Sequence, residues 1–352
     1  MKLKRTLYFG YYLKQLDREK FRLFLDYVNN EAGMSKASVL SDIFSSVFRH
    51  NISILEYFQF RFYELSEKQR SEWAGTGHMY EYQLGMNPKE KRQILDDKTL
   101  FYKNYGEFFV HSVADLVDLK KTENAKKILN NRSGKLVFKK SDGKCGAQVE
   151  IRDCSEFDQS NIHPFMKNNS YDLVEEFINQ HEHINLLSPS AVNTVRIITQ
   201  LNHKGDVDIL GCRFRISVDS PVDNMAAGNL AAYIDESSGV VSGPAVYGDI
   251  TKEECTVHPV TGVKITGFQV PFWSEILEMV KRAAMKHPQN RSIGWDVVVT
   301  DNGPGLIEGN HDWCKLLWQL PVKKGLKPML EKYDGSCSTK KVKQVEPVSV
   351  GG

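Results

Sequence analysis

This chain of 352 residues contains two different hydrophobic patterns, one after the other, and this change of pattern is the sequence feature that most restricts its possible folds. Between residues 10 and 95, apolar side chains recur at the spacing of one helix face, as Phe21, Phe24 and Val28 do. From about residue 135 the pattern changes to short apolar runs separated by Gly and Asp, beginning with Leu136–Phe138. The sequence therefore predicts a helical N-terminal region followed by a mixed α/β (α+β) fold.

Further strands and one helix can be placed within the second pattern. The other runs that predict strands are Val149–Ile151, Val195–Ile198, Val207–Leu210 and Trp295–Val299. Residues 271–287 predict a helix, because Pro271 stands at its start and Trp273, Leu277 and Val280 share one face. We expect this helix to be part of the scaffold.

Composition and charge exclude several classes of protein. The 46 basic and 44 acidic residues give a net charge of +2, which does not favour nucleic acid as a partner. No run reaches the roughly 20 apolar residues of a membrane span, and no apolar signal segment follows the basic start. The six cysteines show no CxxC spacing, so neither a zinc site nor a disulfide framework is indicated. A reducing cytoplasm fits best.

One segment, residues 294–310, predicts a strand, a turn rich in Gly and Pro, and a second strand. If this hairpin is centred on Gly303, Asp296 faces Asn310 and Glu308 lies diagonal to Asp296. Because side chains alternate along a strand, all three would project from one face. That face would carry three oxygen ligands.

A cation is one explanation for two acids on one face. Two carboxylates about 4 Å apart repel by on the order of 4 kcal/mol at an effective dielectric near 20. A divalent metal removes this cost, and oxygen-only ligands suit magnesium. The alternative is that the two acids are simply solvated on an edge hairpin.

The segment Leu136–Val149 suggests phosphate binding. A strand ends at Lys139, and a loop with Gly143 and Gly146 returns into the next strand. Glycines let backbone N–H groups approach phosphate oxygens, and the lysine supplies a positive charge. Most hairpin loops of this kind bind nothing, so the segment alone is a weak signal.

Arg196 lies inside an otherwise apolar strand. A buried charge without a partner is expensive, so either an internal carboxylate or a bound anion is expected beside it.

Taken in order, five segments resemble the ATP-grasp proteins associated with sugar transfer and surface-polysaccharide synthesis. They are Ser190–Arg196, Val222–Gly228, His258–Gly262, Ile293–Asp296 and Gly303–Asn310. The resemblance extends over roughly residues 95–320. It implies an ATP-grasp fold, in which two α+β lobes sandwich ATP, over residues 96–333 after a helical region at 1–95. The phosphate-loop lobe would span about 130–175 and the metal-binding lobe about 176–333. Residues 334–352 contain Ser, Lys, Gly and Val without periodicity, which predicts a loosely ordered or disordered tail.

The resemblance also implies a role for individual residues, with ATP and Mg²⁺ as cofactors. Lys98 and Lys139 would reach the nucleotide phosphates, although Lys140 could take the place of Lys139. The hinge that receives adenine would be Glu175, Glu176, Phe177 and Ile178, and Gln180 or Glu182 would bind the ribose. Arg196, Arg215 and Asn229 would lie near the transferred phosphate. Asp296, Glu308 and Asn310 would hold the metal.

The chemistry implied by the resemblance joins a carboxylate to an amine through an acyl phosphate. This needs no nucleophilic side chain, and the sequence offers no convincing Ser-His-Asp or Cys-His set. The expected partners are a sugar acid, free or polymer-linked, and an amino acid or other amine. Three alternatives remain: a kinase acting on a sugar, a non-catalytic nucleotide-binding component of capsule assembly, and a peripheral membrane role for the basic, aromatic start Lys2–Tyr12. The sequence leaves the oligomeric state open.

Overall fold

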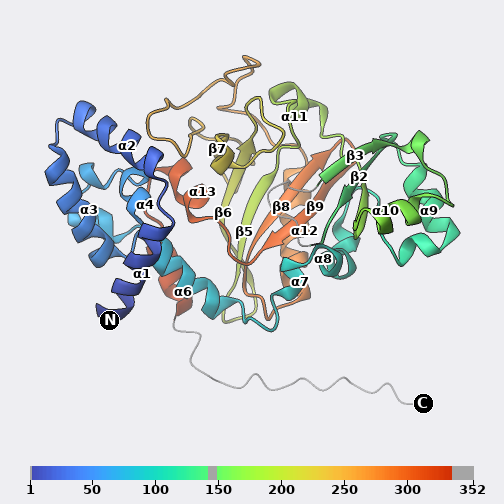
Figure 1. Cartoon of the computed structure of the whole chain (residues 1–352), viewed down its shortest axis with the longest axis horizontal. Helices are drawn as coiled ribbons and strands as arrows, with labels where there is room; N and C mark the ends of the chain where they lie inside the picture. The colour runs from blue at the N-terminus through green and yellow to red at the C-terminus, as the bar shows by residue number, and fades with distance from the viewer. Residues whose placement is uncertain (1, 142–148, 335–352) are drawn as a thin grey trace.

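The computed structural model describes residues 2–141 and 149–334 (Figure 1). The chain begins with a group of helices, continues through a small sheet, and ends in a larger sheet with its covering helices. Among the described residues, none of the helices combines the length and the apolar character of a membrane span.

The first 105 residues are mainly helical. The helices are α1 (Lys2–Lys14), α2 (Arg18–Glu31), α3 (Lys36–His50), α4 (Ile54–Gln59), α5 (Glu67–Ser71), α6 (Thr76–Met86), α7 (Gln93–Asp96) and α8 (Lys98–Tyr105). Side chains cap several of their first turns: Asp17 accepts from Lys20 N, and Ser53 forms a capping box with Glu56. Several aromatic residues of this region, Phe24 and Phe58 among them, are buried in a shared core, whereas Tyr11, Phe44 and Tyr80 are exposed.

The small sheet joins strands that are far apart in the sequence. Its strands are β1 (Val113–Asp115), β2 (Lys135–Lys139), β3 (Val149–Asp153) and β4 (Leu173–Glu176), in the antiparallel order β1-β4-β2-β3. Helices α9 (Thr122–Leu129) and α10 (Ile162–Asn168) contribute Ile128 and Met166 to a core with Leu136 and Phe138 of β2.

The large sheet has the antiparallel order β7-β6-β5-β8-β9. Its strands are β5 (Val195–Leu201), β6 (Val207–Ile216), β7 (Leu230–Ile234), β8 (Ser292–Thr300) and β9 (Gly303–Asn310). The predicted strand segments at 136–138, 149–151, 195–198, 207–210 and 295–299 all lie within strands of the structure.

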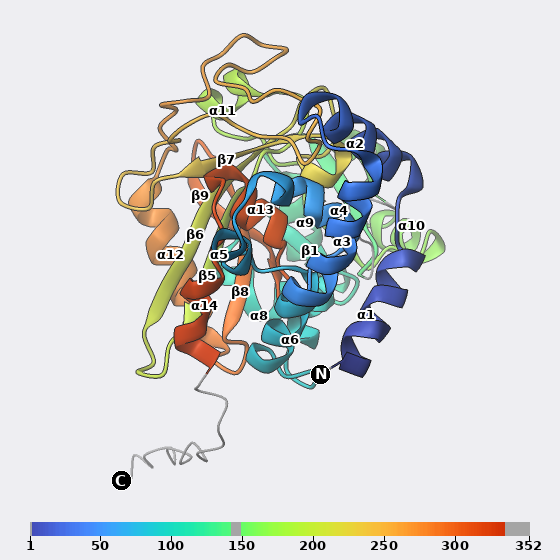
Figure 2. The same ribbon diagram turned by 90° about the vertical axis from the view of Figure 1, so that its left-hand side faces the viewer.

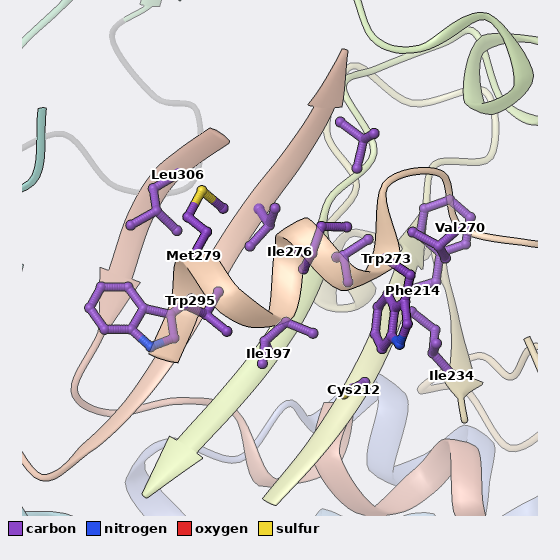
Figure 3. Packing of buried hydrophobic residues seen from close by; sticks show 14 of the residues in the cluster. Ile197, Cys212, Phe214, Ile234, Val270, Trp273, Ile276, Met279, Trp295 and Leu306 are labelled. Carbon is purple, nitrogen blue, oxygen red and sulfur yellow. The ribbon is translucent and has the colours of Figure 1, made fainter. Parts of the chain in front are cut away.

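The helix predicted at residues 271–287 is α12 (Trp273–Lys286), and it covers one face of the large sheet. Its Trp273, Ile276 and Met279 pack against apolar side chains from the sheet (Figure 3). The residues on the sheet side include Ile197, Cys212, Phe214, Ile234, Trp295 and Leu306. Because strand side chains alternate, the intervening residues point to the opposite face.

That opposite face meets the N-terminal helices and the last helices of the described chain. Figure 2 shows α4 beside α13 (Lys315–Gln319), with α1 to α3 farther out, on the side of the large sheet away from α12. Leu317 and Leu320 belong to the same buried cluster as Phe58 and Phe60. Helix α14 (Lys327–Asp334) follows α13, and the short α11 (Glu182–Leu187) precedes the large sheet.

The hairpin of β8 and β9 differs from the predicted register. Its turn is Asp301–Asn302, so Thr300 pairs with Gly303, and Asp296 lies opposite Glu308, whereas Asn310 pairs with Gly294. The predicted pairing of Asp296 with Asn310 was therefore wrong. The reason is the position of the turn, because a turn at Asp301–Asn302 by itself places Ile307 opposite Asp296. A bulge, at which Val297 pairs with Leu306 and Asp296 pairs with Glu308, then leaves Ile307 as an extra residue in β9 and brings Glu308 opposite Asp296.

The packing at Gly325 yields a test of how the segment before α14 is joined to the N-terminal helices. A Cβ at Gly325 would overlap the carbonyl group of Glu72, and nearby Lys327 N donates to Glu72 O at 2.9 Å. We expect Gly325→Ala to destabilise the protein by about 1–3 kcal/mol, because backbone cannot move aside cheaply. Gly10 of α1 is the control, since a Cβ there meets nothing within 4 Å. Gly10→Ala should stabilise by up to about 1 kcal/mol, and equal melting temperatures for both variants would contradict this packing.

Candidate functional site

A cleft of 1210 Å³ collects most of the predicted site residues. The predicted nucleotide-binding residues that line it are Lys98, Lys139, Glu175, Glu176, Phe177, Ile178 and Gln180. The predicted phosphate- and metal-side residues that line it are Arg196, Arg215, Asp296, Glu308 and Asn310. Gly143 and Gly146, predicted for the phosphate loop, lie outside the described residues.

On the two inner strands of the small sheet, β2 and β4, Lys139 forms an ion pair with Glu175. Its Nζ lies 2.5 Å from Glu175 Oε2, and His111 Nε2 lies 3.4 Å from the same oxygen. Burial raises the pKa of Glu175, but the positive charge of Lys139 and the contact with His111 lower it by more, to about 2. Lys139 therefore already has a carboxylate partner, and its ammonium, which has three donors, can still donate to a nucleotide phosphate beside it. Lys140 lines the cleft as well.

On the large sheet, Arg196 has the internal carboxylate that was one of its two expected partners. Its Nε and Nη2 donate to the two oxygens of Asp296, at 2.5 and 2.9 Å. Arg215 Nη1 also donates to Asp296 Oδ2 at 2.8 Å, and its Nη2 lies 2.6 Å from Asp223 Oδ1. Neighbouring strands bring these groups together, since Arg196 pairs in register with Asp296.

Glu308 is the carboxyl in this cluster without an arginine. Burial, and after it the charge of Asp296, raise the pKa of Glu308 from its ordinary 4.5 to about 7. Burial also raises the pKa of Asp296, but Arg196 and Arg215 lower it by more, so Asp296 stays ionised. Two guanidinium groups thus balance Asp296 and Asp223, and the third acid, Glu308, is left uncompensated. The sequence-based argument considered a cation or solvent as relief for two acids on one face, whereas the two arginines relieve much of the repulsion.

The residues around Glu308 fit a magnesium ion. Asn310 uses its Nδ2 to donate to Glu308 Oε1 and Gly294 O, both at 3.3 Å, so its Oδ1 can serve as a ligand. Asp296 Oδ2 accepts from two arginine nitrogens but Oδ1 from only one, which leaves a lone pair on Oδ1. Carboxylate and amide oxygens are the ligands that magnesium prefers. Glu308 supplies a carboxyl group that forms no ion pair with an arginine or lysine among the described side chains.

Two predicted residues do not contribute to the cleft lining. Asn229 is buried, and its amide holds the preceding loop: Nδ2 donates to Val222 O and Asn224 O, and Oδ1 accepts from Val218 N. The catalytic role predicted for Asn229 therefore has no support, because all of its polar atoms are used within the loop. Glu182 is exposed at the start of α11, away from the cleft.

Two residues of the site were missed. Asp223 is buried in the cleft, where it pairs with Arg215 and accepts from the backbone and hydroxyl of Thr194. Asp223 belongs to Val222–Gly228, one of the five segments that carry the family resemblance. A charged residue in a strand, such as Arg215, needs a partner, and this need could have pointed to Asp223. His111, stacked on Phe109 and close to Glu175, had no such signal, because its neighbours come together only in the sheet.

The comparison with protein families identifies the chain. Residues 78–335 match the family described as sugar-transfer associated ATP-grasp. The chain belongs to this family. The ATP-grasp fold predicted from the sequence is thereby confirmed. No curated protein matches the chain.

Several solved structures resemble this family member at low similarity. The ADP complex of PurK, an N5-carboxyaminoimidazole ribonucleotide synthetase, has a TM-score of 0.37 and 9% identity, covering 62% of this chain and 45% of PurK. The ATP-grasp ligase PsnB with its minimal precursor has a TM-score of 0.41 and 11% identity, covering 72% and 63%. An L-amino acid ligase from Bacillus licheniformis has a TM-score of 0.36 and 14% identity, covering 67% and 49%. The chain thus spans only about half to two thirds of these proteins, and likenesses this low carry no argument about its activity.

The raised pKa of Glu308 predicts how the variant Glu308→Gln behaves. Between pH 4.5, its ordinary pKa, and about 7, the folded protein keeps a proton at Glu308 that the unfolded chain has released, so stability falls as the pH rises through this range. Glutamine has no such proton. We expect Glu308→Gln to gain stability over wild type as the pH rises from about 4.5 to about 7, by on the order of 2 kcal/mol. Thermal melts across this range measure the gain.

The same variant should lose function. If Glu308 holds magnesium, ATP turnover by Glu308→Gln should fall by about a hundredfold or more. Full turnover in this variant would remove Glu308 from the metal site. A stability difference that does not change with pH would contradict its raised pKa.

The position of Lys139 predicts selective loss of ATP binding. We expect Lys139→Ala to weaken ATP by about tenfold or more and adenosine much less, because adenosine has no phosphate for the ammonium to contact. Calorimetric titration of both compounds gives the ratio. Lys140→Ala is the matched control, and a selective loss of ATP in that variant alone would assign the phosphate to Lys140. Equal weakening of ATP and adenosine in Lys139→Ala would contradict the assignment.

Proposed function

We propose that this protein is an ATP-dependent carboxylate-amine ligase that joins an amino acid or other amine to a sugar acid. The observation that carries the proposal is the single cleft shared by Lys139, Arg215, Glu308 and Asn310. A lysine for nucleotide phosphates and an acid with an uncompensated charge thus border the same space. The family description adds the association with sugar transfer.

In the first proposed step, an oxygen of the substrate carboxylate attacks the γ-phosphorus of ATP. A new P–O bond forms, the bond to the β-phosphate oxygen breaks, and ADP leaves, so the products are an acyl phosphate and ADP. Lys98 and Lys139 would bind the nucleotide phosphates. Magnesium, held by Asp296, Glu308 and Asn310, would supply positive charge toward the phosphate oxygens.

The arginines would prepare the cleft for this transfer. Arg215 lines the cleft beside Asp296 and Asp223, where its charge would orient the substrate carboxylate or the transferred phosphoryl group. Arg196 is nearly fully buried and binds Asp296 through both oxygens, so it acts as a positioning residue for that carboxylate.

In the second proposed step, the amine nitrogen attacks the carbonyl carbon of the acyl phosphate. The C–N bond forms, the C–O bond to phosphate breaks, and inorganic phosphate leaves while the nitrogen loses a proton. These two reaction steps require positioning and charge stabilisation, and they form no covalent bond to a protein side chain. Cys212, for example, is buried in the core, where burial raises the pKa of its thiol to about 12.

The proposed partners are a sugar carboxylate, free or within a polysaccharide, and an amine, with no nucleic acid. A cytoplasmic location, a role in surface-polysaccharide synthesis and the membrane association of Lys2–Tyr12 remain predictions. Flotation of the chain with liposomes, compared with a chain lacking residues 1–30, tests the last of these.

A product assay tests the proposed reaction. The protein is incubated with ATP, magnesium, a panel of uronic acids and a panel of amino acids, and phosphate release is followed together with mass spectrometry of the products. We expect ADP, phosphate and an amide, all abolished by EDTA and reduced about a hundredfold in Glu308→Gln. A phosphate ester in place of the amide would establish a sugar kinase. Nucleotide binding with no product for any pair would favour the non-catalytic alternative.

A further inference from the structure

The cleft has a second end that the proposed nucleotide site does not use. Its 1210 Å³ exceeds the roughly 300–1,000 Å³ usual for one ligand site. Beyond the nucleotide-binding candidates, it is lined by Lys20 of α2, by Leu55, Glu56 and Gln59 of α4, and by Lys315 of α13. We call these five residues the acceptor end.

Four of these five residues lie outside the region shared with the family. The family match begins at residue 78, whereas Lys20, Leu55, Glu56 and Gln59 precede it. The nucleotide and metal candidates all lie within the match. The N-terminal helices therefore supply part of the cleft that the common family region does not contain, which is where selection among substrates can be made.

The acceptor end is held rigidly against the large-sheet part of the molecule. Gln59 Nε2 donates to Gly248 O at 2.9 Å, and Lys315 Nζ lies 3.0 Å from Glu56 Oε1. Helix α13 is anchored by Arg213, whose Nε donates to Trp318 O at 2.9 Å, and by the side chain of Gln319, which bonds both N and O of Ala74. Lys315 is thus fixed in place before any ligand binds.

Glu56 has no remaining capacity to bind a ligand. Its Oε2 accepts from Ser53 N and Thr76 N, and its Oε1 accepts from the Thr76 hydroxyl and faces Lys315 Nζ. These four contacts use all of its lone-pair directions.

Lys315, in contrast, keeps donors for a ligand. Its ammonium has three, and Glu56 is its ion-pair partner among the described residues. Burial lowers the pKa of Lys315, but the Glu56 carboxylate raises it by more, so the ammonium stays charged. Lys20 adds a second positive charge, with no ion pair to any described residue, while Asp312 lines the cleft at an exposed position.

We propose that Lys315 binds a second anionic group of the substrate, a phosphate or a carboxylate other than the one that reacts. This inference rests on the proposed function, because it assumes that the reacting carboxylate lies at Arg215 and Glu308. A simple sugar acid has one anionic group, which the reaction requires there. A sugar acid that also carries a phosphate or a second carboxylate can satisfy both ends of the cleft.

The test measures binding to the full chain loaded with magnesium and a non-hydrolysable ATP analogue. Calorimetry compares glucuronate, glucuronate 1-phosphate and digalacturonate. We expect one or both doubly anionic compounds to bind at least about tenfold more tightly than glucuronate, as a charge-assisted hydrogen bond to Lys315 would give. Tighter binding of the 1-phosphate alone identifies a phosphate, and tighter binding of digalacturonate identifies a carboxylate.

The decisive variant is Lys315→Met combined with Glu56→Gln. Removing both charges avoids leaving the Glu56 carboxylate buried without its ion-pair partner. The amide at position 56 can accept from Ser53 N and Thr76 N through its oxygen and donate to the Thr76 hydroxyl through its nitrogen. We expect this variant to lose the tenfold preference while its affinity for the ATP analogue is unchanged. The control is Lys323→Met, which removes an exposed lysine paired with Glu254 outside the cleft and should keep the preference.

Two results would overturn the inference. One is equal or absent binding of the three compounds by wild type when the analogue binds. The other is a preference that survives in the double variant. If the ATP analogue itself does not bind, the result counts against the proposed ligase and the Lys315 inference together. Failure of the proposed function can therefore be distinguished from failure of the Lys315 inference alone.

Discussion

Two buried arginines and two carboxylates at the centre of the large sheet set the arrangement of everything around them. A charge removed from water needs a partner in good geometry, and an error of one residue in register would leave Arg196 opposite an apolar side chain of β8. Arg215 extends the same constraint to β6 and to the loop that carries Asp223. Three strands and one loop are therefore held in fixed relation by ion pairs that also form one side of the cleft.

The apolar pattern predicted the scaffold well because it depends on local sequence. Short apolar runs identified β5 and β8, and the Pro271 start with its amphipathic face identified α12. The pairing of Arg196 with Asp296 could not be predicted in the same way. It depends on β5 lying beside β8, and these strands are separated by about a hundred residues of chain. The sequence showed only that Arg196 required some partner.

The predicted site shows a similar division. Lys139 and Glu175 were both chosen for contacts with the nucleotide, but each contacts the other in the structure. The register of β2 and β4, with Val137 opposite Glu175 and Lys139 opposite Leu173, makes them diagonal neighbours. Asn229 was chosen because it follows a recognised segment, although its amide is needed to close that loop. Sequence motifs locate such a loop without telling which of its polar residues face the ligand.

The extra residue Ile307 lets one strand serve two environments in succession. Residues two apart on a regular strand share a face, yet Leu306 lies in the core under α12 while Glu308 borders the cleft. The bulge shifts the phase of the strand between them. A relative that lacks the bulge can keep both environments only if its acid stands one position closer to the turn. Alignments of this hairpin that allow no gap would then place the metal ligand on the wrong face, so a missing acid at this position in a related sequence need not mean a missing site.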